Sequence, residues 1–435
     1  MKERLLHLWE DLRTSLWFVP SLMTAAAAGL AFVTPGLEPA AEPWLHAVDG
    51  LSMWGPEGAR SLLSTVASSM ITIAGVAFSI MVVALQLASS QLGPRLLRTF
   101  MRDTGNQVVL GTFISTFMYC LLAMLSIGNE GPSAVPRLAV TVGVVLALLS
   151  LGVLIYFIHH AALSMQAPEV IAAVTGEFHR AIEEVGAAKR REGDRGRAVP
   201  EGLRADVAIA ARRAGYVRRL DQAGLMRAAT AHDVVIVLEY RPGHFVFEGS
   251  TLAHVTRRLD GDEGEALARA VNDGIILGRQ RTAEQDVEYC ATQLVEIALR
   301  ALSPGINDPF TAVACVDHLS NALGRLARTA FPEAGLAGDD EQLRLVRQGV
   351  RFPDVLDAAF RQIRQASERS PALAIRLLQG LARIGAQVES GADRDAVRRH
   401  ADLTLETGLD ACTVEPDRDA VRERYQAVLD ALRST

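Results

Sequence analysis

Residues 61–94 read SLLSTVASSMITIAGVAFSIMVVALQLASSQLGP, and this stretch between Arg60 and Arg95 contains no Asp, Glu, Lys or Arg. An α-helix needs roughly 20 apolar residues to cross the hydrocarbon core of a bilayer, and this stretch is longer. The stretch therefore predicts a membrane-spanning helix and places the chain among membrane proteins.

The few polar residues of this stretch recur at helical spacing. At 100° per residue one sector about 80° wide holds a row of small and polar residues, and the opposite face is apolar. The row consists of Ser61, Ser64, Ser68, Thr72, Gly75, Ser79, Gln86 and Ser90. Hydroxyl groups within a membrane favour a partner or water over lipid, so we expect this polar row to face protein or a water-filled path. The candidate pore-lining residues are Ser64, Ser68, Thr72, Gly75, Ser79 and Gln86.

Two interpretations of the row stay open. In the first, small side chains let helices approach closely and hydroxyls bond across the interface. The third predicted span carries a similar row and is a natural packing partner; its members are Thr112, Ser115, Thr116, Tyr119, Ala123 and Ser126. In the second interpretation, the row of each subunit of a homo-oligomer lines a pore on the symmetry axis, because four spans are too few to enclose a wide path alone.

The first 160 residues predict the whole membrane part. Residues 1–14 place apolar side chains on one helical face, a pattern typical of an interfacial amphipathic helix. A transmembrane domain follows at 15–160. Its predicted spans cover about 15–34, 62–92, 107–127 and 138–158.

Basic residues near the predicted spans set the expected orientation. One side carries Lys2, Arg4 and Arg13 together with Arg95, Arg98 and Arg102, whereas the other side carries only Arg60 and Arg137. The positive-inside rule then predicts that both termini are cytoplasmic. Acidic residues near the N-terminus argue against a cleaved signal peptide, so we expect a multi-pass protein of a bacterial inner membrane.

Charged residues are sparse up to about residue 166 and dense beyond it, which predicts a soluble cytoplasmic part. A connecting helix and charged loop are expected at 161–204. Period-two patterns then predict a small β module, barrel-like or sandwich-like, at 205–260. Helical patterns continue over 261–435, including a helix at 341–348. The predicted fold class is thus a four-helix transmembrane α bundle followed by a soluble α+β domain, with a β module and a helical bundle.

Composition excludes several functions. The formal net charge of −6 offers no basic face for a phosphate backbone, so we expect no nucleic-acid partner. Four scattered cysteines lack the close spacing of a metal site and are expected to be buried free thiols. The chain lacks a phosphate-binding loop ending in Gly-Lys-Ser/Thr, a His-Glu-x-x-His motif and a nucleophile elbow. We therefore expect no cofactor and no enzyme activity.

Three runs of sequence resemble a known family. They are residues 71–79 with 84–91, Gly278-Arg-Gln-Arg-Thr282 with Gln285-Asp286, and residues 300–312, which read RALSPGINDPFTA. Together they resemble a family of bacterial membrane proteins known as domain of unknown function 2254. The resemblance covers nearly the whole chain and implies a membrane location, but it implies no activity.

Two of these runs form the candidate site of the cytoplasmic part. A Pro/Gly/Asn loop that leads into a helix N-terminus can bind an anion, because free N–H groups and the helix dipole favour negative charge. The other interpretation is structural: an Arg–Asp network holds two helices, and Asp308 itself caps the helix. The candidate residues are Arg279, Arg281, Gln285, Asp286, Ser303, Gly305, Asn307 and Asp308.

The sequence thus favours an oligomeric, channel-like or transport protein. Its second span lines a pore, and its cytoplasmic domain assembles or regulates it. The expected partners are the lipid bilayer, further copies of the chain, and a small ion or anionic ligand. The alternative is a non-conducting membrane sensor or scaffold whose cytoplasmic domain binds a partner or a small anionic ligand.

Overall fold

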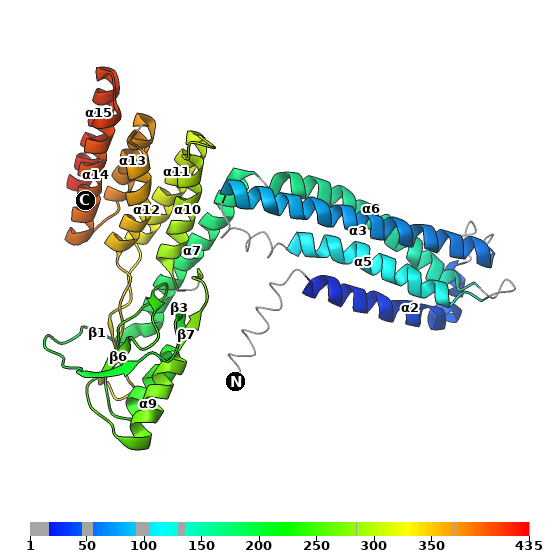
Figure 1. Cartoon of the computed structure of the whole chain (residues 1–435), viewed down its shortest axis with the longest axis horizontal. Helices are drawn as coiled ribbons and strands as arrows, with labels where there is room; N and C mark the ends of the chain where they lie inside the picture. Colours follow the sequence, from blue (N-terminus) through cyan, green and yellow to red (C-terminus); the bar gives the residue numbers. More distant parts are fainter. Residues whose placement is uncertain are drawn as a thin grey trace. The chain divides into compact units, whose positions relative to one another are not determined.

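The computed structural model describes residues 17–45, 55–92, 104–128, 135–164, 166–283, 285–368 and 370–434 (Figure 1). The chain divides into two compact units, Met1–Glu169 and Val170–Thr435, which we describe one at a time. The predicted interfacial helix at 1–14 and the arginine-bearing segment 95–102 lie outside the described residues.

Unit 1 contains four helices that are long and apolar enough to cross a membrane. These are α2 (Phe18–Leu45), α3 (Pro56–Leu92), α5 (Thr104–Leu125) and α6 (Arg137–Ser164). Helix α5 packs against all three others, and half of it is buried, more than of any other span. The predicted bundle of four spans is confirmed, with α5 as its central helix.

Helix α2 is longer than the sequence predicted. The first span was expected to end at about residue 34, whereas α2 continues through Pro35 to Leu45. A proline removes a single N–H donor, and other backbone bonds can keep the helix intact. The extension also has a partner, since the Glu38 carboxylate accepts a hydrogen bond of 2.6 Å from the backbone N–H of Arg137, where α6 begins.

Unit 2 begins along helix α7 and contains two β-sheets. The larger sheet has six strands in the order β1-β8-β9-β4-β6-β2, and the smaller has three in the order β5-β3-β7. All pairs are antiparallel except β4 with β9. The elements of this region are α7 (Ala167–Glu192), η4 (Gly193–Arg195), β1 (Gly196–Arg197), β2 (Val207–Ala210), β3 (Gly215–Leu220), α8 (Gln222–Ala231), β4 (Ile236–Leu238), β5 (Phe245–Val246), β6 (Thr251–Val255), α9 (Gly261–Gly274), β7 (Ile275–Gly278), β8 (Gly335–Ala337) and β9 (Leu343–Val346).

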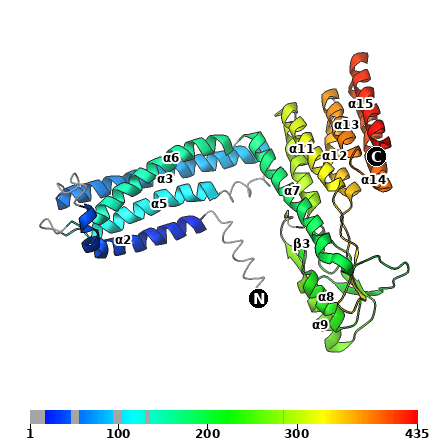
Figure 2. The ribbon, with the colours of Figure 1, turned by 180° about the vertical axis from the view of Figure 1, so that it is seen from behind.

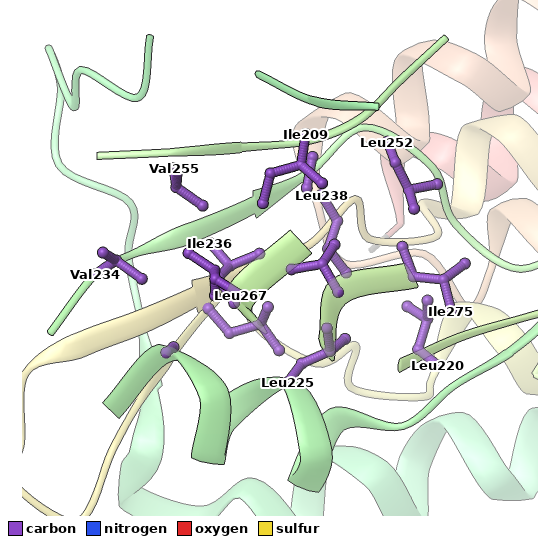
Figure 3. Close-up of a cluster of buried hydrophobic side chains, with 14 of the residues drawn as sticks. Ile209, Leu220, Leu225, Val234, Ile236, Leu238, Leu252, Val255, Leu267 and Ile275 are labelled. Atoms are coloured by element: carbon purple, nitrogen blue, oxygen red, sulfur yellow. The ribbon is translucent and has the colours of Figure 1, made fainter. Parts of the chain in front are cut away.

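A single apolar core joins both sheets to helices α8 and α9. Leu225 of α8 and Leu267 of α9 point toward Ile236 and Leu238 of β4 (Figure 3). Side chains from the smaller sheet, Leu220 and Ile275, lie in the same cluster. Burying this shared cluster stabilises the two sheets and two helices as one module.

The predicted limits of the β module, 205–260, are too narrow. Strand β1 precedes them, β7 follows α9, and β8 and β9 come after two further helices. The predicted helix at 341–348 is strand β9, which pairs in parallel with β4. Sequence periodicity is a local signal, so strands as short as β1 and β8 cannot be assigned from it when their partners are distant in the chain.

The predicted helical bundle is present as a stack of helical hairpins. Helices α10, α12 and α14 pack in succession, and α11, α13 and α15 do the same beside them (Figures 1 and 2). The six helices are α10 (Val287–Ala301), α11 (Pro309–Ala327), α12 (Phe352–Ala366), α13 (Pro371–Gly385), α14 (Gly391–Ala411) and α15 (Glu415–Arg433).

Candidate functional site

The polar row of α3 lies on the surface of the chain. Helix α3 turns its small and apolar side chains, including Leu63, Ala67 and Met70, toward the bundle. The row lies on the opposite side, and Gly75 has open space around it. All six candidate pore-lining residues are exposed: Ser64, Ser68, Thr72, Gly75, Ser79 and Gln86.

Several hydroxyls on the exposed side of α3 bond to the helix itself. The hydroxyl of Thr72, within the row, donates to the carbonyl oxygen of Ser68 at 2.8 Å. The hydroxyl of Ser69, outside the row, donates in the same way to Thr65 at 2.8 Å. This bonding to the preceding turn lowers the cost of a hydroxyl in lipid, so the hydroxyl chemistry alone does not reveal what the row faces.

Most of the polar row of α5 lies inside the bundle, and Ser126 at its end is exposed. The Thr116 and Ser150 hydroxyl oxygens are 3.0 Å apart and link α5 to α6. The fully buried Tyr119 donates from its hydroxyl to the carbonyl oxygen of Ala139 at 3.0 Å, and its oxygen lies 3.3 Å from the Thr34 hydroxyl of α2.

The predicted pairing of the α3 row with the α5 row is therefore wrong. Helix α5 is central and directs its polar groups at α2 and α6, while α3 contacts it through apolar side chains. Helical spacing identifies a polar face, but it does not reveal which neighbour that face meets.

In unit 2, Arg281 and Asp286 form a two-pronged ion pair. Arg281 Nε donates to Asp286 Oδ2 at 2.9 Å, and its Nη2 donates to Oδ1 at 3.0 Å. Asp286 also caps α10, since Oδ1 accepts the backbone N–H of Tyr289 at 3.0 Å. Its side chain is 2% exposed; burial raises the pKa of Asp286, while Arg281 and Tyr289 oppose that rise by stabilising the carboxylate.

Three residues that sequence reasoning missed complete this junction. Arg241 pairs with Glu288 at 2.6 Å, and Gly243 packs so closely on the ion pair that an added Cβ would clash with the Asp286 carboxylate. The φ angle of Gly243 is 92°, which favours glycine. The dipeptide Pro242-Gly243 marks a turn in the sequence, but nothing local shows that the turn meets α10.

The remaining members of this run have separate environments. Gln285, at φ 54°, accepts the backbone N–H of Leu220 with its side-chain oxygen at 3.3 Å and so joins β3 to the junction. Arg279 is exposed. The run therefore holds the β module to the start of α10, whereas the structural interpretation expected the Arg–Asp network to hold two helices.

The loop at 303–308 forms a tight, self-bonded turn. Ser303 accepts the backbone N–H groups of Ile306 and Asn307, and Asp308 N–H donates to Ala301 at 2.7 Å. Asp308 Oδ1 accepts the backbone N–H of Thr311 at 3.1 Å, and Oδ2 accepts its hydroxyl at 2.5 Å. This hydroxyl bond lowers the pKa of Asp308, which caps α11 as a carboxylate.

The two runs do not form one site. Asp286 caps the beginning of α10, while residues 303–308 follow its end, and a 15-residue helix spans about 22 Å. A carboxylate already occupies the N-terminus of α10 and that of α11, which opposes anion binding at either position. Among the described residues no group of three or more metal-ligating side chains comes together, and the four cysteines are buried free thiols.

Comparisons with known proteins agree with a membrane location. The profile of a family described as "Predicted membrane protein (DUF2254)" matches residues 13–383. The chain is 32% identical over 416 residues to uncharacterised proteins Mb1321c of Mycobacterium bovis and Rv1290c of Mycobacterium tuberculosis, covering 94% of this chain and 79% of each relative. No solved structure matches the chain. With four membrane-spanning helices and this match, the chain belongs to the DUF2254 family of predicted membrane proteins.

Proposed function

We propose that the protein is an oligomeric, channel-like membrane protein in which the polar row of α3 lines a path between copies of the chain. One observation carries this proposal: the row lies on the exposed side of α3, opposite the side that packs in the bundle. A row that no described helix of its own chain covers is available to face a symmetry axis.

A path through one bundle is less consistent with the packing. Large side chains, among them Phe113, Tyr119 and Phe157, fill the space between α3, α5 and α6 and are fully buried. Close-packed apolar interiors exclude water. A water-filled path along α3 therefore needs several copies of the chain around it.

In this proposal unit 2 is a cytoplasmic domain that assembles or regulates the oligomer in a bacterial inner membrane. The basic residues at 2–13 and 95–102 support cytoplasmic termini. Reporter fusions within 46–54 and 129–134 should then report the periplasm, and a cytoplasmic signal from either would reverse the orientation.

Two neighbouring serines give a matched test of the path. Ser68 lies at the centre of the row, while Ser69 is also exposed but points about 100° away. Ser68→Leu should block ion flux into protein-containing liposomes, because a ring of leucines raises a dewetting barrier. Ser69→Leu makes the same change toward lipid and should leave flux intact. Wild-type protein that is folded but monomeric in a mild detergent, or equal flux of both variants, would contradict the proposal.

The second candidate, a non-conducting scaffold, is favoured by the stack of hairpins in unit 2. Helical hairpins packed in two layers present extended surfaces that suit protein partners. The hydroxyl-to-backbone bonds of α3 also allow a lipid-facing row. A lack of flux in liposomes that contain an intact oligomer would favour this candidate.

A further inference from the structure

The turn between α10 and α11 exposes a compact apolar surface, which we call the 304–310 surface. Phe310 is 84% exposed and Ile306 is 41% exposed, and Pro304 and Pro309 beside them are exposed as well. A single exposed apolar side chain is ordinary, but a group of them on one projecting turn indicates a contact surface.

This surface is held in place by its own turn. Backbone bonds from Ile306, Asn307 and Asp308 close the turn, and Asn307 adopts φ 49°. The Asp308 carboxylate faces Thr311 with both oxygens and is engaged as a cap. A turn built in this way keeps Ile306 and Phe310 outside and does not let them fold back into the core.

The packing of α11 on α7 identifies the end of unit 2 on which the surface lies. Thr175 contacts His318 at 2.9 Å, and further along both helices Glu183 pairs with Arg325 at 3.0 Å. Residue numbers increase in the same direction along both helices, from Thr175 and His318 to Glu183 and Arg325, so α7 and α11 run parallel and side by side (Figure 2). Phe310 precedes His318 by eight residues, and the position eight residues before Thr175 is Ala167, where α7 begins.

The start of α7 is also where the chain arrives from the last span. Helix α6 ends at Ser164, and α7 begins at Ala167. The part of α6 that is apolar enough to span the membrane ends at Ala161. Covalent connectivity therefore ties this end of unit 2 to a membrane surface, whichever side of the membrane that is. Another turn at the same end, between α14 and α15, exposes Val414 at 52%.

We propose that the 304–310 surface docks on the lipid bilayer, with Phe310 and Ile306 entering the boundary between headgroups and acyl chains. Tethering by the spans keeps the surface at high effective concentration near the bilayer, so a small apolar contact suffices. Docking would fix unit 2 against the membrane. This inference does not depend on whether the α3 row lines a path.

Spin labels on the full-length protein in liposomes test this proposal. Labels at Phe310→Cys and Ile306→Cys should collide several-fold more often with oxygen, which concentrates in lipid, than with a water-soluble nickel chelate. Phe247→Cys is the matched control, because Phe247 is a 66% exposed aromatic beside β5 in the β module. Its label should collide preferentially with the nickel chelate.

Two results would overturn lipid docking. If the label at Phe310 behaves like the label at Phe247, the 304–310 surface faces water. If both collision partners are excluded at Phe310, the surface is covered by protein, either another copy of the chain or unit 1. The thermal unfolding midpoints of the labelled variants should equal that of the parent, because the replaced side chains are exposed in unit 2.

Discussion

The α3 and α5 helices carry similar rows of polar residues, yet the chain uses them in opposite ways. In α5, Thr116 and Tyr119 bond to α2 and α6 inside the bundle. In α3, the row is left on the surface. Unit 2 repeats this division, since Asp286 is enclosed by its partners while the neighbouring Arg279 is exposed. A polar group that the chain itself partners supports folding, and one that the chain leaves outside is available for another purpose.

The largest expected effect concerns the enclosed ion pair. Asp286→Ala removes the cap of α10 and leaves Arg281 without its carboxylate, so we expect a loss of about 3 kcal/mol of unfolding free energy. This lies at the lower end for buried pairs because the Arg281 side chain is 26% exposed. Arg279→Ala, the exposed control in the same run, should change the thermal unfolding midpoint little. If the two variants lowered the thermal unfolding midpoint equally, enclosed and exposed charged groups would contribute alike to stability, and the comparison drawn above would be wrong.

Tyr119→Phe measures the enclosed row of α5 by deleting one hydroxyl. The variant loses the bond to Ala139 and the contact with Thr34, which should cost about 1 kcal/mol, within the range for hydrogen bonds between membrane helices. Tyr156→Phe makes the same change on the exposed side of α6 and should be neutral. The measurement is thermal unfolding in detergent; a neutral Tyr119→Phe would show that α5 does not need this bond.

Asp308 separates a capping role from an anion site. Asp308→Ala should cost about 1 kcal/mol, whereas Asp308→Asn should cost less, because Asn keeps a capping oxygen and loses only the charge. Thr311 lowers the pKa of Asp308, so its carboxylate stabilises the fold fully above the ordinary pKa of about 4 and loses this effect as the pH falls through the lowered value. Asp308→Asn should therefore weaken the acid dependence of the unfolding midpoint. If added phosphate stabilises the parent, and stabilises Asp308→Asn more strongly, an anion does bind at this helix N-terminus.

The smallest expected effect concerns the row of α3. Ser68→Ala should change the unfolding free energy of the dissociated chain by less than about 0.5 kcal/mol, since the side chain is exposed. Ser150→Ala removes a buried serine that contacts Thr116 and should cost more. A destabilising Ser68→Ala in the dissociated chain would place Ser68 within the bundle and contradict the division between the rows.

Local patterns predicted the four spans, strands within 205–260 and the helical character of much of 261–435. Each of these has a strong period of its own. The length of α2 was missed because Pro35 is a local stop signal, although the helix continues through it. Strand β9 was missed because its parallel pairing with β4 joins residues more than 100 positions apart.

The sequence predicted the role of a single residue of the candidate site, the cap Asp308, but not how the residues of the two runs are arranged in space. Asp308 directly before Pro309 predicted a helix cap, and the structure confirms that Asp308 caps α11. The separation of Arg281 from the 303–308 loop was missed because the two runs are close in sequence, whereas in the structure helix α10 lies between them and holds them apart. The enclosure of Asp286 depends on Gly243, whose approach is a tertiary contact and leaves no local pattern.

Cysteine accessibility at Ser68 and Ser69 tests the central claim most directly. Cys120, which is buried in unit 1, is first replaced by Ala; the other three cysteines, Cys290, Cys315 and Cys412, are buried in unit 2, where burial raises the pKa of each thiol. In the folded oligomer in liposomes, we predict that Ser68→Cys reacts readily with a small, polar thiol reagent, while Ser69→Cys, facing lipid about 100° away, does not. Equal reactivity of the two positions, or reaction at Ser69→Cys alone, would contradict a water-filled path along the α3 row.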